Sequence, residues 1–248
     1  MATNHPWHRS AHRPTIDLVG FDGDDTLWHS EGYYRHAEAA FEEILRAWTD
    51  IDSEVIRQRL LAEERRTLRV YGYGAKGMTL SMLEAAIDIT DGRIDARDMR
   101  RILALGRRVL EHPVELLPGI RQAVEAVARK YRIVLITKGD LIHQESKVAQ
   151  CGLADLFHRI EIVSEKNPRS YAKVLAEFDL PASRFAMVGN SMRSDIEPVV
   201  ALGGFGIHMP YHVTWEHELQ HGVEADHPRV AGIDKPGDIM RALKRFAA

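Results

Sequence analysis

Three carboxylates within four positions are the feature of this sequence best suited to chemistry. Asp22, Asp24 and Asp25 follow an apolar run over residues 16–21, which is typical of a short buried strand. Like charges at the end of a strand repel one another, so folding alone does not favour this cluster. A divalent cation would relieve the repulsion, and Mg2+ prefers carboxylate oxygens. One carboxylate to attack, one to move a proton and one metal ion would suffice for phosphoryl transfer, which is the chemistry that this segment indicates.

The spacing within the cluster supports the same interpretation. Side chains alternate along an extended segment, so Asp22 and Asp24 point to the same side of the chain. Gly23 stands between them and lets a ligand approach the backbone closely. The sequence therefore predicts a site in which two carboxylates act on a ligand held against the main chain.

The composition limits the kinds of protein that could carry this site. The chain has 248 residues, of which 45% are hydrophobic and 28% charged, and these values suit a soluble protein with a proper core. The formal net charge of −3 gives no support to nucleic-acid binding. No apolar run approaches the roughly 20 residues of a transmembrane helix, and the first residues lack the apolar stretch of a secretory signal. We therefore expect a cytoplasmic protein that binds neither nucleic acid nor membranes, while its oligomeric state stays open.

The pattern of apolar residues predicts the elements that position the carboxylates. Residues 1–14 show no periodicity and are interpreted as a mobile tail. Over residues 31–110 apolar side chains recur at helical spacing in four segments, which predicts a small helical bundle. From Pro118 onward helices alternate with apolar strands. We expect these strands at residues 132–136, 160–163, 185–188 and 205–208.

Strands that are apolar throughout and separated by helices indicate a parallel sheet covered on both faces. The prediction is an α/β protein, in which an all-helical cap is inserted into a doubly wound, Rossmann-like parallel sheet. The expected division is a catalytic core of residues 15–28 and 115–248 and a cap of residues 29–114.

Polar residues follow three of the expected strands, and ligands of such sheets bind beyond the carboxyl ends of the strands. Any one of these residues would be ordinary in a loop, but together they predict one site. They are Asp22 and Asp24, then Thr137, Lys138 and Gly139, and then Gly189, Asn190 and Ser191.

The order of these residues resembles the motifs of the haloacid dehalogenase-like hydrolase superfamily, most of whose members are Mg2+-dependent phosphatases. Its first motif, Asp-x-Asp-x-Thr, is matched by residues 22–26, and its second, a Ser or Thr after a hydrophobic strand, by Thr137. Its third motif, a Lys before a helix, fits Lys166, and its acidic fourth motif fits residues 189–195. The helical insert also lies where that family places its first type of cap.

The resemblance implies a role for each residue. Asp22 would attack phosphorus to form an aspartyl-phosphate, and Asp24 would protonate the leaving oxygen and later deprotonate water. Lys166 would offset the negative charge that a phosphate meets among the aspartates. The remaining implied contacts are Gly23, Thr137, Lys138 and Gly139 for the phosphate, and Asp22, Asp24, Asn190 and Asp195 for Mg2+.

The fourth motif departs from the family's pattern at Asn190, where an aspartate is usual. An amide oxygen can ligate Mg2+, but it lacks a full charge. We expect Asp195 to carry more of the metal role, and which of the two residues touches the metal is left open.

Residues 71–77, Tyr-Gly-Tyr-Gly-Ala-Lys-Gly, fall between the second and third helices of the expected cap. They form either a plain flexible turn or a loop that selects the substrate, in which Lys76 would bind the phosphate ester.

The expected function is Mg2+-dependent hydrolysis of a small phosphorylated metabolite whose identity the sequence does not disclose. A phosphomutase shares every core residue and stays an alternative. A haloacid dehalogenase uses the same aspartate without a metal, but it has no use for an acid at Asp24. A non-catalytic binding protein on the same fold would be marked by loss of Asp22 or Lys166, and neither is lost.

Overall fold

The sheet that carries the predicted site has six parallel strands in the order β3–β2–β1–β4–β5–β6. The computed structural model describes residues 16–213 and 221–246, so the expected tail lies outside the described residues. The strands are β1 Leu18–Phe21, β2 Arg132–Lys138, β3 Arg159–Val163, β4 Phe185–Gly189, β5 Phe205–His208 and β6 Val230–Gly232. β1 is central, and its Phe21 lies opposite Leu135 of β2 and Val188 of β4. This register brings the carboxyl ends of three strands to one level.

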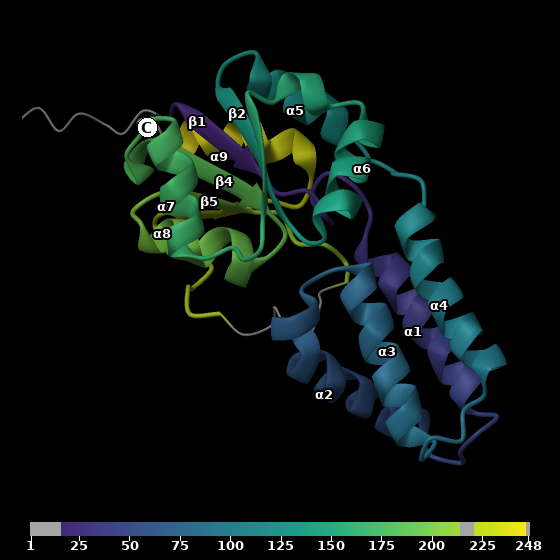
Figure 1. The fold of residues 1–248 in the computed structure, drawn as a ribbon. Helices are drawn as coiled ribbons and strands as arrows, with labels where there is room; N and C mark the ends of the chain where they lie inside the picture. Colours follow the sequence, from purple (N-terminus) through teal and green to yellow (C-terminus); the bar gives the residue numbers. More distant parts are fainter. Residues whose placement is uncertain (1–15, 214–220, 247–248) are drawn as a thin grey trace, which may run out of the picture.

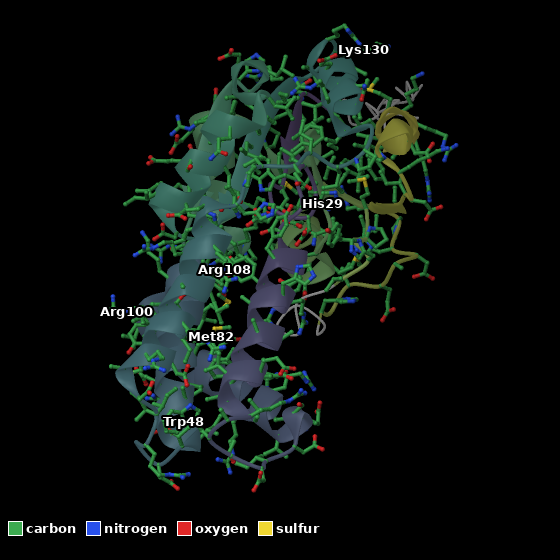
Figure 2. All side chains as sticks on the ribbon, turned by 90° about the vertical axis from the view of Figure 1, so that its right-hand side faces the viewer. His29, Trp48, Met82, Arg100, Arg108 and Lys130 are labelled. Carbon is green, nitrogen blue, oxygen red and sulfur yellow. The ribbon has the colours of Figure 1, made fainter. Side chains whose placement is uncertain are left out.

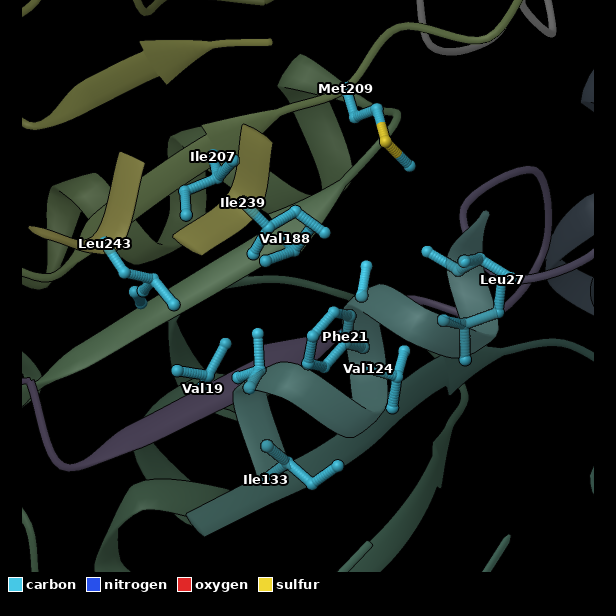
Figure 3. Close-up of a cluster of buried hydrophobic side chains, with 14 of the residues drawn as sticks. Val19, Phe21, Leu27, Val124, Ile133, Val188, Ile207, Met209, Ile239 and Leu243 are labelled. Atoms are coloured by element: carbon cyan, nitrogen blue, oxygen red, sulfur yellow. The ribbon is translucent and has the colours of Figure 1, made fainter. Parts of the chain in front are cut away.

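Helices cover both faces of the sheet, which confirms the doubly wound prediction (Figure 1). Alternate residues of each strand point to opposite faces, so Val19 and Phe21 pack on one side and Leu18 on the other. Figure 3 shows the first of these clusters, where strand side chains meet Val124 and Leu243. The helices on that face are α5 Ile120–Ala128, α6 Leu141–Cys151 and α9 Ile239–Phe246, and those on the other are α7 Pro168–Glu177 and α8 Glu197–Ala201.

Four helices lie between β1 and α5 and form a bundle with its own apolar core, as the helical spacing predicts. Phe41, Ile56, Met82 and Ile102 are fully buried within it. In Figure 2, Trp48 marks the far end of this bundle and Lys130 the far end of the sheet part, with His29 between them. The helices are α1 Glu31–Leu45, α2 Ser53–Tyr71, α3 Ala75–Ile89 and α4 Ala96–Glu111.

Two short connections join the bundle to the sheet and run beside each other. The Leu117 N–H donates to the Leu27 carbonyl oxygen at 2.9 Å, and the His29 N–H donates to the Glu115 carbonyl oxygen at 3.0 Å. A few backbone hydrogen bonds therefore hold the two connections together, close in sequence to the carboxylates at residues 22–25. The exact division at residues 29–114 stays a prediction.

Three features differ from the elements expected from the sequence. The short strand β6 and the helix α9 were not anticipated, and the segment after β4 begins as a π-helical turn at Met192–Ile196 before α8. Short 3-10 turns lie at Ala154–Leu156, Ala182–Arg184 and Pro236–Asp238. Among the helices of the described residues, none is both long and apolar enough to cross a membrane.

Candidate active site

A buried lysine bridges two of the predicted carboxylates. Lys166, which lies just before α7, donates through Nζ to Asp22 and, at 2.7 Å, to Asp195 Oδ1. All three residues are buried. Burial and the adjacent Asp195 raise the pKa of Asp22 to about 8, although the Lys166 ammonium pulls it down. Burial would lower the pKa of Lys166, but the two carboxylates raise it well above its ordinary value. The two carboxylates of Asp22 and Asp195 thus share the single ammonium of Lys166, which cannot balance both of their charges.

Asn190 extends its side chain into the same place from the end of β4. Its Oδ1 accepts a hydrogen bond from Thr26 Oγ1 at 3.2 Å. The position of that oxygen is also 3.1 Å from Asp22 Oδ2 and 3.3 Å from the Asp24 carbonyl oxygen, both of which are acceptors. With the amide reversed, Nδ2 would stand there and donate to the same oxygens. The amide nitrogen suits this position without a cation, and the oxygen suits it with one.

These oxygens fit a magnesium ion. Mg2+ binds oxygens octahedrally at about 2.0–2.1 Å, which places neighbouring ligand oxygens about 2.9 Å apart. The separations of 3.1 and 3.3 Å around Asn190 are hydrogen-bond distances for the reversed amide, so the fit lies in the type of ligand rather than in the spacing. Within the described residues, no group of three or more His, Cys, Asp and Glu side chains could hold a metal. The candidate Mg2+ ligands are not such a group, because they combine the Asp22 carboxylate with one amide oxygen and one backbone carbonyl oxygen.

Asp195 differs from Asn190 in that both of its oxygens are engaged elsewhere. Oδ1 accepts from Lys166, and Oδ2 accepts from the Ser191 N–H at 3.0 Å. A Cβ on Gly189 would lie 2.2 Å from Oδ2, so only glycine at that position admits this carboxylate. The expectation that Asp195 is the stronger metal ligand stays untested, and this geometry favours Asn190.

The Asp24 side chain is directed toward α6. Its Oδ1 accepts hydrogen bonds from Trp28 Nε1 at 2.6 Å and from Lys147 Nζ at 2.8 Å. Gln144 Nε2 lies 3.4 Å from Oδ2. Burial by itself would raise the pKa of Asp24, but Lys147 and the hydrogen bonds hold it below the ordinary value. The backbone carbonyl oxygen of Asp24 therefore lies near the Asn190 side chain, while its ionised carboxylate binds Lys147.

The end of β2 supplies the predicted phosphate-binding groups. Thr137 is buried, and its Oγ1 accepts a hydrogen bond from Gln144 Nε2 at 2.6 Å. Lys138 Nζ donates to Ser194 Oγ at 2.9 Å and lies 4.6 Å from the centre of the Tyr73 ring. Gly139 follows in a left-handed conformation, with φ of 144°. The structure thus brings the expected residues of all three strands to one place.

Gly23 approaches the same groups closely. A Cβ added there would lie 2.7 Å from the Trp28 ring and 3.1 Å from Thr137 Oγ1. A side chain at this position would displace Trp28 or Thr137, so glycine keeps the carboxylate loop against the end of β2.

The third aspartate, Asp25, has a structural role. The Asp25 carboxylate accepts from the backbone N–H groups of Ser30 and Glu31 at 2.8 and 3.1 Å, at the start of α1. Burial and the neighbouring Asp24 raise the pKa of Asp25 to about 7. Asp25 therefore ties the first helix of the bundle to the carboxylate loop.

Lys76 lies apart from this cluster. α3 begins at Ala75, so Lys76 belongs to the first turn of a helix and only residues 72–74 form a loop. Its Nζ donates to Asp140 Oδ1 at 2.9 Å, at the start of α6. Lys76 is not among the residues that line the cavity described below, whereas Tyr73 and Gly74 are.

A cavity of about 150 Å³ lies between the strand ends and the helical bundle. Its sheet side includes Asp22, Asp24, Thr137 and Lys166, and Asn190 also lines it. Its opposite side is formed by α1, α2, α3 and the loop at residues 72–74. Asp22 thus faces a partly open cavity between the sheet and the helical bundle.

Sequence reasoning missed Lys147, Gln144 and Trp28. Gln144 and Lys147 stand three positions apart on α6 and are buried on one face, while Glu145 and Ser146 between them are exposed. The helical spacing could have identified them as a pair. It does not indicate that this face is turned toward Asp24, because that depends on how α6 packs.

Comparisons with known proteins cover most of the chain. Residues 16–203 match the family model of the haloacid dehalogenase-like hydrolases. A haloacid dehalogenase-like family hydrolase from Xanthomonas campestris is 55% identical, with 96% of this chain and 95% of that chain covered and a TM-score of 0.84. A comparison with curated proteins gives no match.

More distant structures share the fold but differ in chemistry. The 2-haloacid dehalogenase of Pseudomonas syringae pv. tomato is 22% identical over 94% of this chain and 100% of its own, with a TM-score of 0.62. CbbY of Rhodobacter sphaeroides, in complex with xylulose-1,5-bisphosphate, is 20% identical over 92% and 99%, with a TM-score of 0.57. At such identities the fold does not select a reaction, so the reaction must be argued from the residues.

Proposed function

This chain belongs to the haloacid dehalogenase-like hydrolase family, and we propose that within it the protein is a Mg2+-dependent phosphomonoester hydrolase with Asp22 as nucleophile. The observation that carries the proposal is Asp24, which lies two residues after Asp22 and lines the same cavity. A phosphatase uses such a group to protonate the leaving oxygen, and displacement of a halide by an aspartate needs no such acid. The proposal includes a small phosphorylated substrate, a cytoplasmic location and the division into core and cap given above.

Mg2+, held by Asp22, Asn190 and the Asp24 carbonyl, would add the positive charge that lets a phosphate dianion approach a carboxylate. Lys166 supplies a further positive charge at the same point, since it is buried between Asp22 and Asp195. Thr137 and the adjoining backbone of Lys138 and Gly139 hold the phosphoryl oxygens. Together these groups fix the phosphorus atom in front of Asp22.

The first step transfers the phosphoryl group to the protein. An Asp22 carboxylate oxygen forms a bond to phosphorus as the ester P–O bond breaks, and the leaving oxygen takes a proton from Asp24. Asp24 must be protonated for this step, whereas Lys147 and Trp28 stabilise its ionised form. It therefore turns from Lys147 toward the ester oxygen when substrate fills the cavity.

The second step returns Asp22 to its carboxylate form. Asp24, now ionised, takes a proton from water as the water oxygen bonds to phosphorus and the Asp22–phosphorus bond breaks. Inorganic phosphate leaves and Asp24 keeps the proton for the next cycle. The contact with Lys147 suits this step, because it keeps Asp24 available as a base.

The proposal is tested by phosphate release from a panel of phosphorylated metabolites, with Mg2+ or with a chelator. We expect turnover that requires Mg2+ and is lost in Asp22→Asn. Asp17→Asn is the matched control, since Asp17 lies at the other end of the same strand in a pair with Arg184. Chloride release from 2-chloropropionate without Mg2+, with no phosphate release from any ester, would instead make the protein a dehalogenase.

A further inference from the structure

We propose that Tyr73 limits the length of the alcohol that leaves from the phosphate ester, because its side chain separates the active-site cavity from a second, larger cavity. This inference deepens the proposed phosphatase function and rests on it. The observations that carry it are the second cavity, the residues that the two cavities share, and the contacts that hold Tyr73 between them.

The second cavity lies beside the first and is the larger of the two. Its volume is about 470 Å³, against about 150 Å³ for the cavity in front of Asp22. It is bounded mainly by α7, α8 and the residues just before each of these helices. Neither Asp22 nor Asp24 lines it. The second cavity is therefore separate from the place where phosphoryl transfer would occur.

The described residues that line both cavities form the boundary between them. Tyr73 has the largest side chain of this set and belongs to the loop at residues 72–74, between two helices of the bundle. The others include Lys138 and Lys166, which adjoin the proposed phosphate site. The full set is Leu68, Tyr73, Lys138, Lys166 and Ser194. The Tyr73 ring is thus the large part of the boundary that a substitution can remove without changing the phosphate site.

Contacts with the sheet part hold the Tyr73 side chain at this boundary. Its hydroxyl donates to Glu165 Oε2 at 2.5 Å, and its ring centre lies 4.6 Å from Lys138 Nζ. Glu165 lines the second cavity but not the first, whereas Lys138 lines both. An ammonium over an aromatic ring is an attractive contact. The ring is therefore fixed between the two cavities by a hydrogen bond and a cation–π contact.

The backbone of the loop explains why Tyr73 is directed at the sheet part. Tyr73 stands between Gly72 and Gly74, whose φ angles of 72° and 101° favour glycine. A Cβ on Gly74 would lie 3.3 Å from the Asp140 backbone nitrogen, so the loop passes close to the main chain that follows β2. Lys76 pairs with the Asp140 carboxylate just beyond the loop. These features keep Tyr73 beside the end of β2.

The position of the ring limits the leaving group. The helices and the loop at residues 72–74 face Asp22 across the first cavity, so the alcohol of a bound ester points toward them. A short alcohol stays within the first cavity. A longer one meets the Tyr73 ring and passes only if the ring gives up its contacts with Glu165 and Lys138. Wild type should therefore favour esters of short alcohols.

The experiment measures kcat/KM for ethyl, butyl and octyl phosphate with Mg2+. For wild type, we expect octyl phosphate to be poorer than ethyl phosphate. Tyr73→Ala should raise the ratio of octyl to ethyl phosphate about tenfold or more, since each methylene that leaves water strengthens binding severalfold. An extended octyl chain is longer than a tyrosine side chain, so it reaches beyond the space that the ring vacates. An unchanged ratio, or a gain confined to butyl phosphate, would overturn the inference.

Two further variants assign the effect to the Tyr73 ring. Tyr73→Phe keeps the ring and loses the hydroxyl that contacts Glu165, so it should raise the ratio much less than Tyr73→Ala. Tyr71→Ala is the matched control, because Tyr71 ends α2, contacts Glu84 through its hydroxyl and lines neither cavity. It should keep the wild-type ratio. A rise in either variant equal to that in Tyr73→Ala would contradict the assignment.

Binding separates this inference from the proposed function. Calorimetry with Mg2+ compares octyl phosphate on Asp22→Asn and on Asp22→Asn with Tyr73→Ala, after thermal unfolding has shown that both are folded. Binding that is about tenfold tighter in the double variant supports the inference. If wild type then releases no phosphate from any ester, the phosphatase proposal alone fails. Equal affinity of the two variants, or no binding by either, overturns the inference, and phosphate release by wild type would leave the phosphatase function standing.

Discussion

Lys147 donates a hydrogen bond of 2.8 Å to Asp24 across 123 positions of sequence. Lys147 is buried on α6 and also lies 3.3 Å from Ser30 Oγ, at the start of the bundle. A single ammonium thus contacts the proposed acid–base residue and the joint between sheet and bundle.

Lys147→Met should lower kcat at least tenfold while KM stays within threefold, because Asp24 loses the partner that orients it. Lys173→Met, at an exposed position of α7, is the control. Steady-state kinetics on any accepted ester measure the effect, with thermal unfolding to show that both variants are folded. Unchanged kcat in Lys147→Met would show that Asp24 is positioned without it.

Asn190→Asp should tighten Mg2+ binding about fivefold or more, since it adds a formal charge at a position that lines the cavity together with Asp22. Asn190→Ala should weaken it by a similar factor or more. Calorimetric titration with Mg2+ measures both. Asn167→Asp is the control, because that asparagine caps α7 instead. If Asn190→Ala binds Mg2+ like wild type, Asn190 is not a ligand, and attention returns to Asp195.

His143 predicts a pH dependence of stability. Burial, then the neighbouring Lys147, lowers its pKa to about 4, against an ordinary value of 6.5. Between these values the unfolded chain binds a proton that the folded chain does not, so stability falls as pH drops from about 6.5 to 4. The loss should be on the order of 1–2 kcal/mol, allowing for solvent screening.

Denaturant unfolding at pH 7 and pH 4.5 measures this contribution. His143→Asn should lose less stability over that interval than wild type does. His36→Asn, at an exposed position of α1, is the control and should follow wild type. An identical loss in His143→Asn would mean that other groups cause the acid sensitivity.

The sheet was predictable because its central strands β1 and β4 are apolar throughout and β2 is apolar over residues 133–136, and because polar residues end or follow these three strands at one level. Val134 and Leu135 point to opposite faces, yet both are buried, as expected for a strand covered by helices on each side. β6 was not predictable in this way, because its three residues are too few to show a pattern.

The site residues that follow strand ends were predictable from the sequence. The contacts that depend on how the helices pack were less predictable. Asp22, Thr137 and Asn190 are brought together by the register of β1, β2 and β4. Lys147 meets Asp24 through the docking of α6, and Lys76, in the first turn of α3, pairs with Asp140 before α6. The residue types alone do not indicate in which direction the side chains of Lys147 and Lys76 point.

The proposed phosphatase mechanism requires that Asp22 carries the phosphoryl group during turnover. The most direct measurement is mass analysis of the protein after an acid quench during steady-state turnover of a phosphate ester with Mg2+. We expect one phosphoryl group on the peptide that contains Asp22, absent from Asp22→Asn and from samples with a chelator, and present in Asp17→Asn. Phosphate release by wild type with no phosphoryl group on that peptide, together with full activity of Asp22→Asn, would contradict the account.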